Sequence, residues 1–120
     1  MQNGIMKQKI EHFVKPFPED YLNLIDRGWG NGYVVLPPDH PWFGLDYDQI
    51  DVDVHGGLTF GKMTTNLTWG EIEPNWLNCY IIGFDTAHYQ DNLDEWPKER
   101  VIEETLRLKE QCIQAYESNT

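Results

Sequence analysis

Residues able to carry chemistry are concentrated in two short segments, 52–60 (VDVHGGLTF) and 83–88 (GFDTAH). The first places a histidine, an acid and a hydroxyl around two glycines, whose bare backbone lets a ligand approach closely. The second follows an apolar run, and residues at the end of a buried strand often bind ligands. The two segments therefore predict a binding site for a polar ligand, formed by Asp53, His55, Gly56, Gly57, Thr59, Asp85 and His88.

The same segments contain the ligand types of a metal centre. His55, Asp85 and His88 would form a two-histidine, one-carboxylate set for a divalent ion, with Asp53 or Asp91 as the base. No motif such as H-E-x-x-H fixes their geometry. A metal-dependent hydrolase therefore stands as an alternative to a non-enzymatic binder that needs no cofactor. Structural explanations also stay open, because two glycines suffice for a turn and Asp85 can cap a helix.

The acidic balance excludes one class of partner. The net charge is −11, and between residues 17 and 96 the basic residues are Arg27 and Lys62 alone. Such a chain has no basic stripe for a phosphate backbone, so we expect no direct binding of nucleic acid. The dense acids of 46–53 fit no calcium loop in either register. An acidic inhibitor that imitates nucleic acid is the third function considered.

Apolar periodicity predicts one α+β domain over 1–120, with a small antiparallel or mixed sheet and a C-terminal helix packed across it. Segment 1–31 is expected to be helical or irregular, with a short helix at 19–27, although residues 10–14 also alternate like a strand. Segment 32–93 should form the β-rich core: a strand at 33–36, a hairpin of 50–54 and 58–63, and a central strand within 76–84. Segment 94–117 should be the helix, beginning at Pro97.

Cysteine and hydropathy patterns indicate a reduced compartment. Cys79 and Cys112 lie in apolar stretches and are expected to be free core residues. No run approaches the roughly 18 apolar residues of a membrane span, and no signal peptide is evident. We therefore expect a cytoplasmic protein with no membrane contact, and the oligomeric state stays open.

Four motifs in one order resemble a group of small uncharacterised proteins from phages and prophages. They are GYVV at 32–35, P-x-H-P at 38–41, VHGGLTF at 54–60 and GFDxAH-x-x-D at 83–91. The resemblance implies a phage origin, and a host cytoplasm as the location, without an assigned activity. The group has a cysteine inside GFDxAH and another before GYV, where this chain has Thr86 and Asn31, so thiol or zinc chemistry is not implied at those positions.

The favoured function at this point is a phage accessory protein that binds a small, nucleotide-like ligand and so sequesters a host defence signal. Stacking of a planar base would need aromatic rings near the two segments. The candidates are Trp29, Tyr33, Trp42, Phe43, Tyr47 and Phe60. The expected partner is a small molecule, with a host protein as the partner under the inhibitor alternative.

Overall fold

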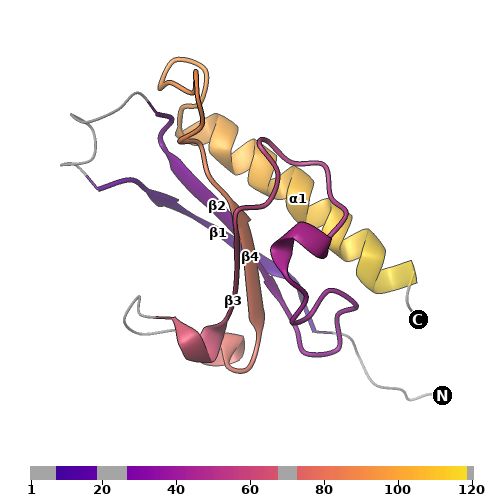
Figure 1. Cartoon of the computed structure of the whole chain (residues 1–120). Helices are drawn as coiled ribbons and strands as arrows, with labels where there is room; N and C mark the ends of the chain where they lie inside the picture. Colours follow the sequence, from indigo (N-terminus) through magenta and orange to yellow (C-terminus); the bar gives the residue numbers. More distant parts are fainter. Residues whose placement is uncertain (1–7, 19–26, 68–72, 119–120) are drawn as a thin grey trace.

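A four-stranded antiparallel sheet with one long helix across it forms the framework of the protein (Figure 1). The computed structural model describes residues 8–18, 27–67 and 73–118. Its strands are β1 (Glu11–Pro16), β2 (Gly30–Leu36), β3 (Phe60–Met63) and β4 (Tyr80–Phe84), in the spatial order β1-β2-β4-β3. The helix α1 (Lys98–Ser118) packs on β1 and β2. The predicted α+β class is therefore confirmed.

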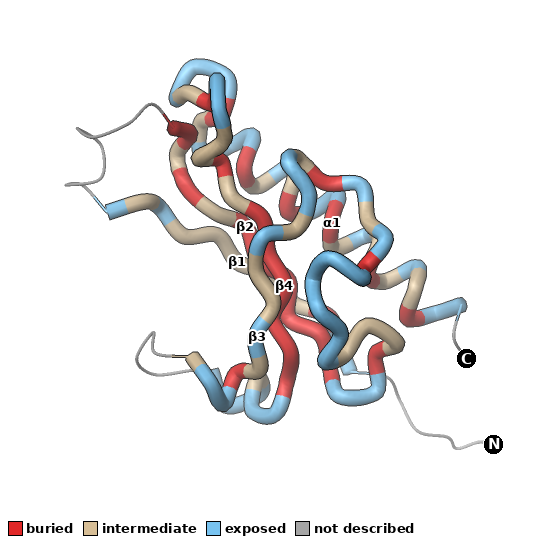
Figure 2. The backbone as a smooth tube through the Cα atoms, in the orientation of Figure 1, coloured by how far each residue is buried: buried red, intermediate tan, exposed pale blue. Residues whose placement is uncertain are grey.

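The two central strands form the most deeply buried part of the chain (Figure 2). Both are rich in β-branched and aromatic residues, and Val34 of β2 pairs with Ile82 of β4. Alternate side chains enter two clusters, because successive residues of a strand point to opposite faces. Val34 and Ile82 face α1, whereas Tyr33 and Ile81 belong to a second cluster on the other face. The predicted central strand within 76–84 is confirmed as β4.

The helix follows the predicted apolar periodicity. Pro97 precedes its first residue, where a missing amide hydrogen costs no helical hydrogen bond. Residues at spacings of three and four form its buried face: Val101, Thr105, Leu108, Cys112 and Tyr116. No helix in the described ranges combines the length and apolar character needed to cross a membrane. Cys79 and Cys112 are buried and free, as predicted.

The N-terminal segment differs from its main prediction. Residues Glu11–Pro16 form an edge strand rather than a helical or irregular segment, and Phe13 pairs with Tyr33 of β2. The alternation over residues 10–14 was the correct signal for this strand. The rings of Phe13 and Tyr33 stack with centroids 4.9 Å apart, so the strand contributes to the second cluster. The helix predicted at 19–27 falls almost wholly on residues 19–26, which lie outside the described part.

The predicted hairpin of 50–54 and 58–63 is wrong. Its turn is present, because the Gly57 N–H donates to the Val54 carbonyl at 2.9 Å. Its first strand is absent: Gln111 of α1 bonds both the N–H and the carbonyl of Asp53, each at 2.8 Å. Its second strand, β3, pairs with β4 instead. Side chains of the helix thus satisfy the backbone groups that a hairpin partner would have used.

Candidate functional site

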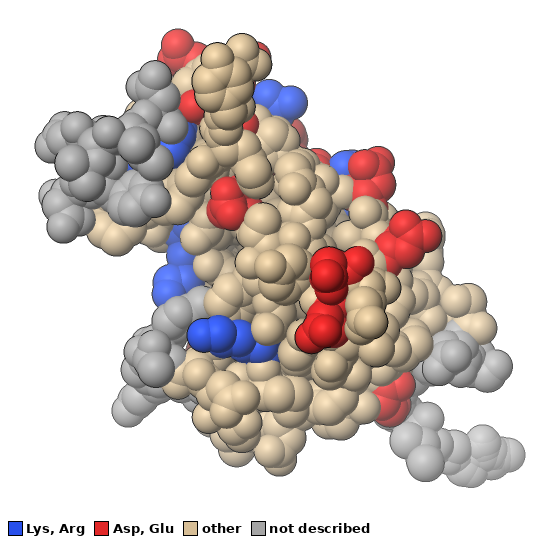
Figure 3. Space-filling view, viewed as in Figure 1, with Lys and Arg blue, Asp and Glu red and all other residues tan. Residues whose placement is uncertain are grey.

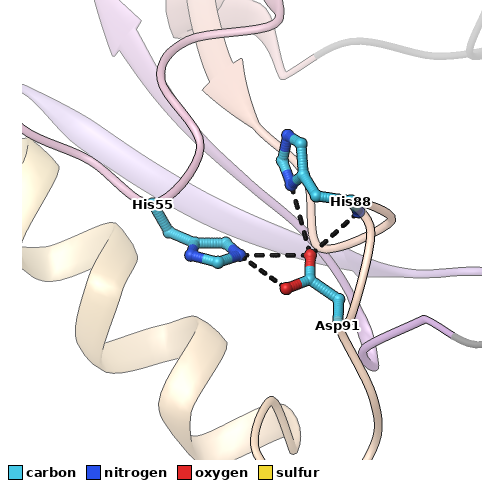
Figure 4. Close-up of side chains that lie close together, drawn as sticks. All are labelled: His55, His88 and Asp91. Atoms are coloured by element: carbon cyan, nitrogen blue, oxygen red, sulfur yellow. Dashed lines mark hydrogen bonds and ion pairs between the residues drawn. The ribbon is translucent and has the colours of Figure 1, made fainter.

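Two histidines and one aspartate meet beyond the end of β4 (Figure 4). His55 comes from the 54–57 turn, whereas His88 and Asp91 come from the loop that follows β4. His55 Nε2 lies 2.9 and 3.1 Å from the two carboxylate oxygens of Asp91, and His88 Nδ1 lies 3.2 Å from Asp91 Oδ2. The three ligand-type atoms all lie within 4.8 Å of one another. Residues more than 30 positions apart in sequence therefore converge on one carboxylate.

Local turn geometry brings Asp91 back to His88. The Asp91 N–H donates to the His88 carbonyl at 2.9 Å, closing a four-residue turn. Gln90 inside it has φ of +74°, a left-handed conformation uncommon outside glycine. In return, the His88 N–H donates to Asp91 Oδ2 at 2.9 Å. Backbone and side chain together hold the carboxylate against both rings.

His55 is fixed from two sides. Its N–H donates to Glu104 Oε2 of α1 at 2.7 Å, and its ring packs on Trp96 with centroids 4.1 Å apart. Glu104 is itself held by Arg107 through two 3.0 Å hydrogen bonds. Charge-assisted hydrogen bonds of this kind are strong and directional. The helix therefore sets the position of His55 although it contributes no group to the centre.

Asp91 carries the negative charge of the centre while being 5% exposed. Burial alone would raise its pKa, but hydrogen bonds from the His55 ring and from the His88 N–H, with the charge of His55, outweigh that effect. The pKa of Asp91 therefore lies below its ordinary value. Asp91 is therefore held in its ionised form, and a buried ionised carboxylate needs a hydrogen-bond donor or a cation as its partner.

The seven predicted ligand-binding residues separate into three groups. His55 and His88 lie in the centre, and Gly56 lies directly against the His88 ring. Thr59 and Asp85 form a pair at its edge, joined by a 2.8 Å hydrogen bond, and Asp85 Oδ1 lies 3.5 Å from His88 Nδ1.

The other two residues of that set are exposed to solvent. Asp53 has an 88% exposed side chain and pairs with Arg107 at 3.0 Å. A Cβ atom at Gly57 would meet nothing within 4 Å.

The carboxylate that lies between the two rings is Asp91 rather than the expected Asp85. Asp91, named only as a base, bridges the two rings, and Asp85 contacts His88 alone. Trp96 and Glu104 were missed entirely. The sequence shows Trp96 just before the helix and Glu104 at the border of its apolar face. Neither position indicates that the residue contacts His55.

The aromatic residues proposed for stacking on a base are mostly used in packing. Tyr33 and Phe60 belong to the second cluster, whereas Trp29, Trp42 and Phe43 pack against the core beneath α1. None of these lines the open hollow beside the centre. That hollow is lined by Ala87, His88, Tyr89, Gln90, Asp91, Asn92 and Glu95.

The spacing of the centre suits a bound metal ion. Two ligands of one metal at about 2.0–2.1 Å lie about 2.9 Å apart at a right angle and about 3.4 Å apart at a tetrahedral angle. The distances from Asp91 to the two ring nitrogens, 2.9, 3.1 and 3.2 Å, fall in that interval, which is also the ordinary range of the hydrogen bonds that join these residues. The His55 and His88 side chains are 25% and 32% exposed. One side of the centre is thus open to water or to a ligand.

No protein-family model, curated protein or solved structure matches this chain.

Proposed function

We propose that this protein binds a divalent metal ion through His55, His88 and Asp91 and holds a small polar ligand on the open side of the metal. The observation that carries the proposal is the meeting of three ligand-type side chains, from two separate segments, within 4.8 Å. Two imidazoles and one carboxylate are a common set for zinc, iron or manganese, with positions left for a ligand. The earlier metal alternative is thereby revised, with Asp91 in place of Asp85.

Charge around the centre supports a metal over direct capture of an anion. Asp91 and Glu95 line the adjoining hollow, Asp85 lies 3.5 Å from His88, and no Lys or Arg is among the lining residues. A phosphate or carboxylate would meet the carboxylates of Asp91 and Glu95 there, with no Lys or Arg to offset them. A divalent ion would reverse the local sign and supply the attraction that the side chains lack.

Capture of the ligand without reaction is the first form of this function. The resemblance to phage proteins supports a use in sequestering a small signalling molecule of a host. Hydrolysis is the second form, and one observation favours it. Asp85, oriented by Thr59 at 2.8 Å and by the Ala87 N–H at 2.9 Å, offers a further carboxylate beside His88. Such a group would accept the proton of a water molecule activated by the metal.

The acidic-inhibitor alternative has less support. Its acids are exposed, but Asp53 is engaged by Arg107. On the face shown in Figure 3, acidic side chains are dispersed among uncharged ones rather than joined in a continuous stripe. A mimic of nucleic acid needs charges at regular phosphate-like spacing.

Calorimetric titration of chelator-treated protein with Zn²⁺ tests the centre. We expect one ion per chain, and an affinity at least about tenfold lower in the variants His88→Gln and Asp91→Asn. Asp53→Asn is the matched control, because its carboxylate lies outside the centre. Thermal unfolding of each variant without metal separates lost ligation from lost folding. Absence of stoichiometric binding to the unaltered protein would reject the proposal.

The chemical state of the released ligand distinguishes capture from hydrolysis. The metal-loaded protein is incubated with a mixture of nucleotides, washed and heated to release what it holds. An unchanged nucleotide supports capture. A dephosphorylated or cleaved product that is not formed by Asp85→Asn supports hydrolysis with Asp85 as the base.

A further inference from the structure

The turn between His88 and Asp91 holds one residue of the centre at each end. The hydrogen bond from the Asp91 N–H to the His88 carbonyl closes it, and Gln90 adopts a left-handed conformation within it. Such a conformation costs a side-chain-bearing residue roughly 1 kcal/mol. A glycine at position 90 would avoid this cost. Tyr89 and Gln90 consequently form the tip of this turn, and its two ends are His88 and Asp91 of the centre.

The side chain of Tyr89 is almost fully exposed to solvent. It is 92% exposed, the highest value among the large apolar side chains of the described ranges. Tyr33, Tyr80 and Tyr116, in contrast, are all at most 6% exposed. Tyr89 nevertheless lines the same hollow as His88 and Asp91. Its ring therefore contributes little to core burial and stands beside the open side of the centre.

We propose that the ligand of this site carries a planar ring next to its metal-binding group, and that the ring stacks on Tyr89. The inference rests on the proposed function, since the metal would hold the anionic group. Aromatic side chains stack on planar heterocycles with little dependence on their exact identity. Glu95 lines the same hollow and can accept a hydrogen bond from an amino group of such a ring.

A nucleoside monophosphate is the simplest ligand with this chemistry. Its phosphate oxygens are hard donors suited to a divalent ion, and its base is a planar ring joined to the phosphate by one sugar. Tyr89 directly follows His88, so its ring starts one residue, about 3.8 Å between Cα atoms, from the centre. Tyr89 and His88 thus offer a ring and a metal ligand from neighbouring positions that line one hollow.

Binding of AMP and of ribose 5-phosphate to the Zn²⁺-loaded protein, measured by calorimetry, tests the inference. The two ligands share the phosphate and the sugar and differ in the ring. We expect AMP to bind about tenfold more tightly or better, and Tyr89→Ala to remove that preference. Tyr89→Phe should retain it, because the ring remains. Tyr47→Ala is the matched control, since Tyr47 is 43% exposed and lies outside the residues of the hollow.

The outcomes distinguish this inference from the function on which it rests. Equal affinity for the two ligands, no binding of AMP, or an AMP preference that survives in Tyr89→Ala would overturn ring stacking. Stoichiometric Zn²⁺ binding would still stand in each of these cases. Failure of the unaltered protein to bind Zn²⁺ would overturn both. Because Tyr89 is almost fully exposed, the variants should fold normally, as circular dichroism will check.

Discussion

The ring of His88 occupies the space that a side chain on Gly56 would require. A Cβ atom at Gly56 would lie 2.4 Å from His88 Cε1 and 2.5 Å from His88 Nε2, closer than real Cβ contacts occur. The double glycine therefore does more than turn the chain. Its first member lets the 54–57 turn approach the loop after β4, which brings His55 to Asp91.

Alanine at each glycine separates these two roles. Both residues have positive φ, +69° at Gly56 and +78° at Gly57, so either alanine should cost about 1 kcal/mol of folding stability. Gly57→Ala meets nothing within 4 Å and should keep the metal affinity. Gly56→Ala must also displace His88 and should weaken Zn²⁺ binding about tenfold or more. Equal Zn²⁺ affinities for the two variants would contradict this role of Gly56.

Glu104 positions His55 from the helix. Glu104→Ala leaves the His55 N–H without its 2.7 Å acceptor and should lower the free energy of unfolding by about 1–3 kcal/mol. We also expect Zn²⁺ affinity to fall about tenfold, because the ring loses its support. Glu104→Gln, which keeps an acceptor, should be intermediate. Glu103→Ala, an exposed neighbour on the same helix, serves as control, and a loss of equal size there would argue against positioning.

Asp91 makes stability depend on acid pH. Its folded pKa lies below the ordinary value, because the hydrogen bonds from His55 and His88 outweigh the effect of burial. The stabilisation is therefore complete above the unfolded pKa, near pH 4, and is lost as pH falls through the lower folded value. Asp91→Asn should flatten the decline in unfolding free energy between about pH 5 and pH 3, measured by urea denaturation without metal. The exposed Asp94→Asn should leave the decline unchanged.

Gln90→Gly tests the strain in the turn. Glycine adopts φ of +74° without steric cost, so the folded state gains up to about 1 kcal/mol, offset in part by the greater freedom of the unfolded chain. We expect a melting temperature equal to or slightly above that of the unaltered protein, with Zn²⁺ binding retained. A clear loss of stability would show that the Gln90 side chain itself supports the turn.

The cysteines should be unreactive while the chain is folded. Burial raises the pKa of the Cys112 thiol to about 12 and also raises that of Cys79. Because the thiolate is the reactive form, a disulfide reagent at pH 8 should modify neither residue in the native protein. Both should react once guanidinium unfolds it. Rapid labelling of the native protein would contradict the buried placement.

Sequence patterns alone determined the framework and the two segments of the centre. The helix and the central strands were predicted because burial on one face leaves a period in the apolar residues, as in Val101, Thr105 and Leu108. The same reasoning placed His55 and His88 in polar segments next to buried ones. Such periods depend only on neighbours along the chain, which a sequence displays directly.

Only the tertiary structure decided how those segments meet. The hairpin prediction was wrong because side chains of the helix bond the backbone of this segment: Gln111 bonds Asp53, and Glu104 bonds His55. These partners lie about 50 residues away or more, and a local sequence pattern does not indicate such distant partners.

The choice of carboxylate has the same origin. Asp85 and Asp91 both lie three residues from His88, so spacing cannot separate them. The left-handed Gln90 brings Asp91 back between the two rings, whereas Thr59 and the Ala87 N–H hold Asp85 at the edge.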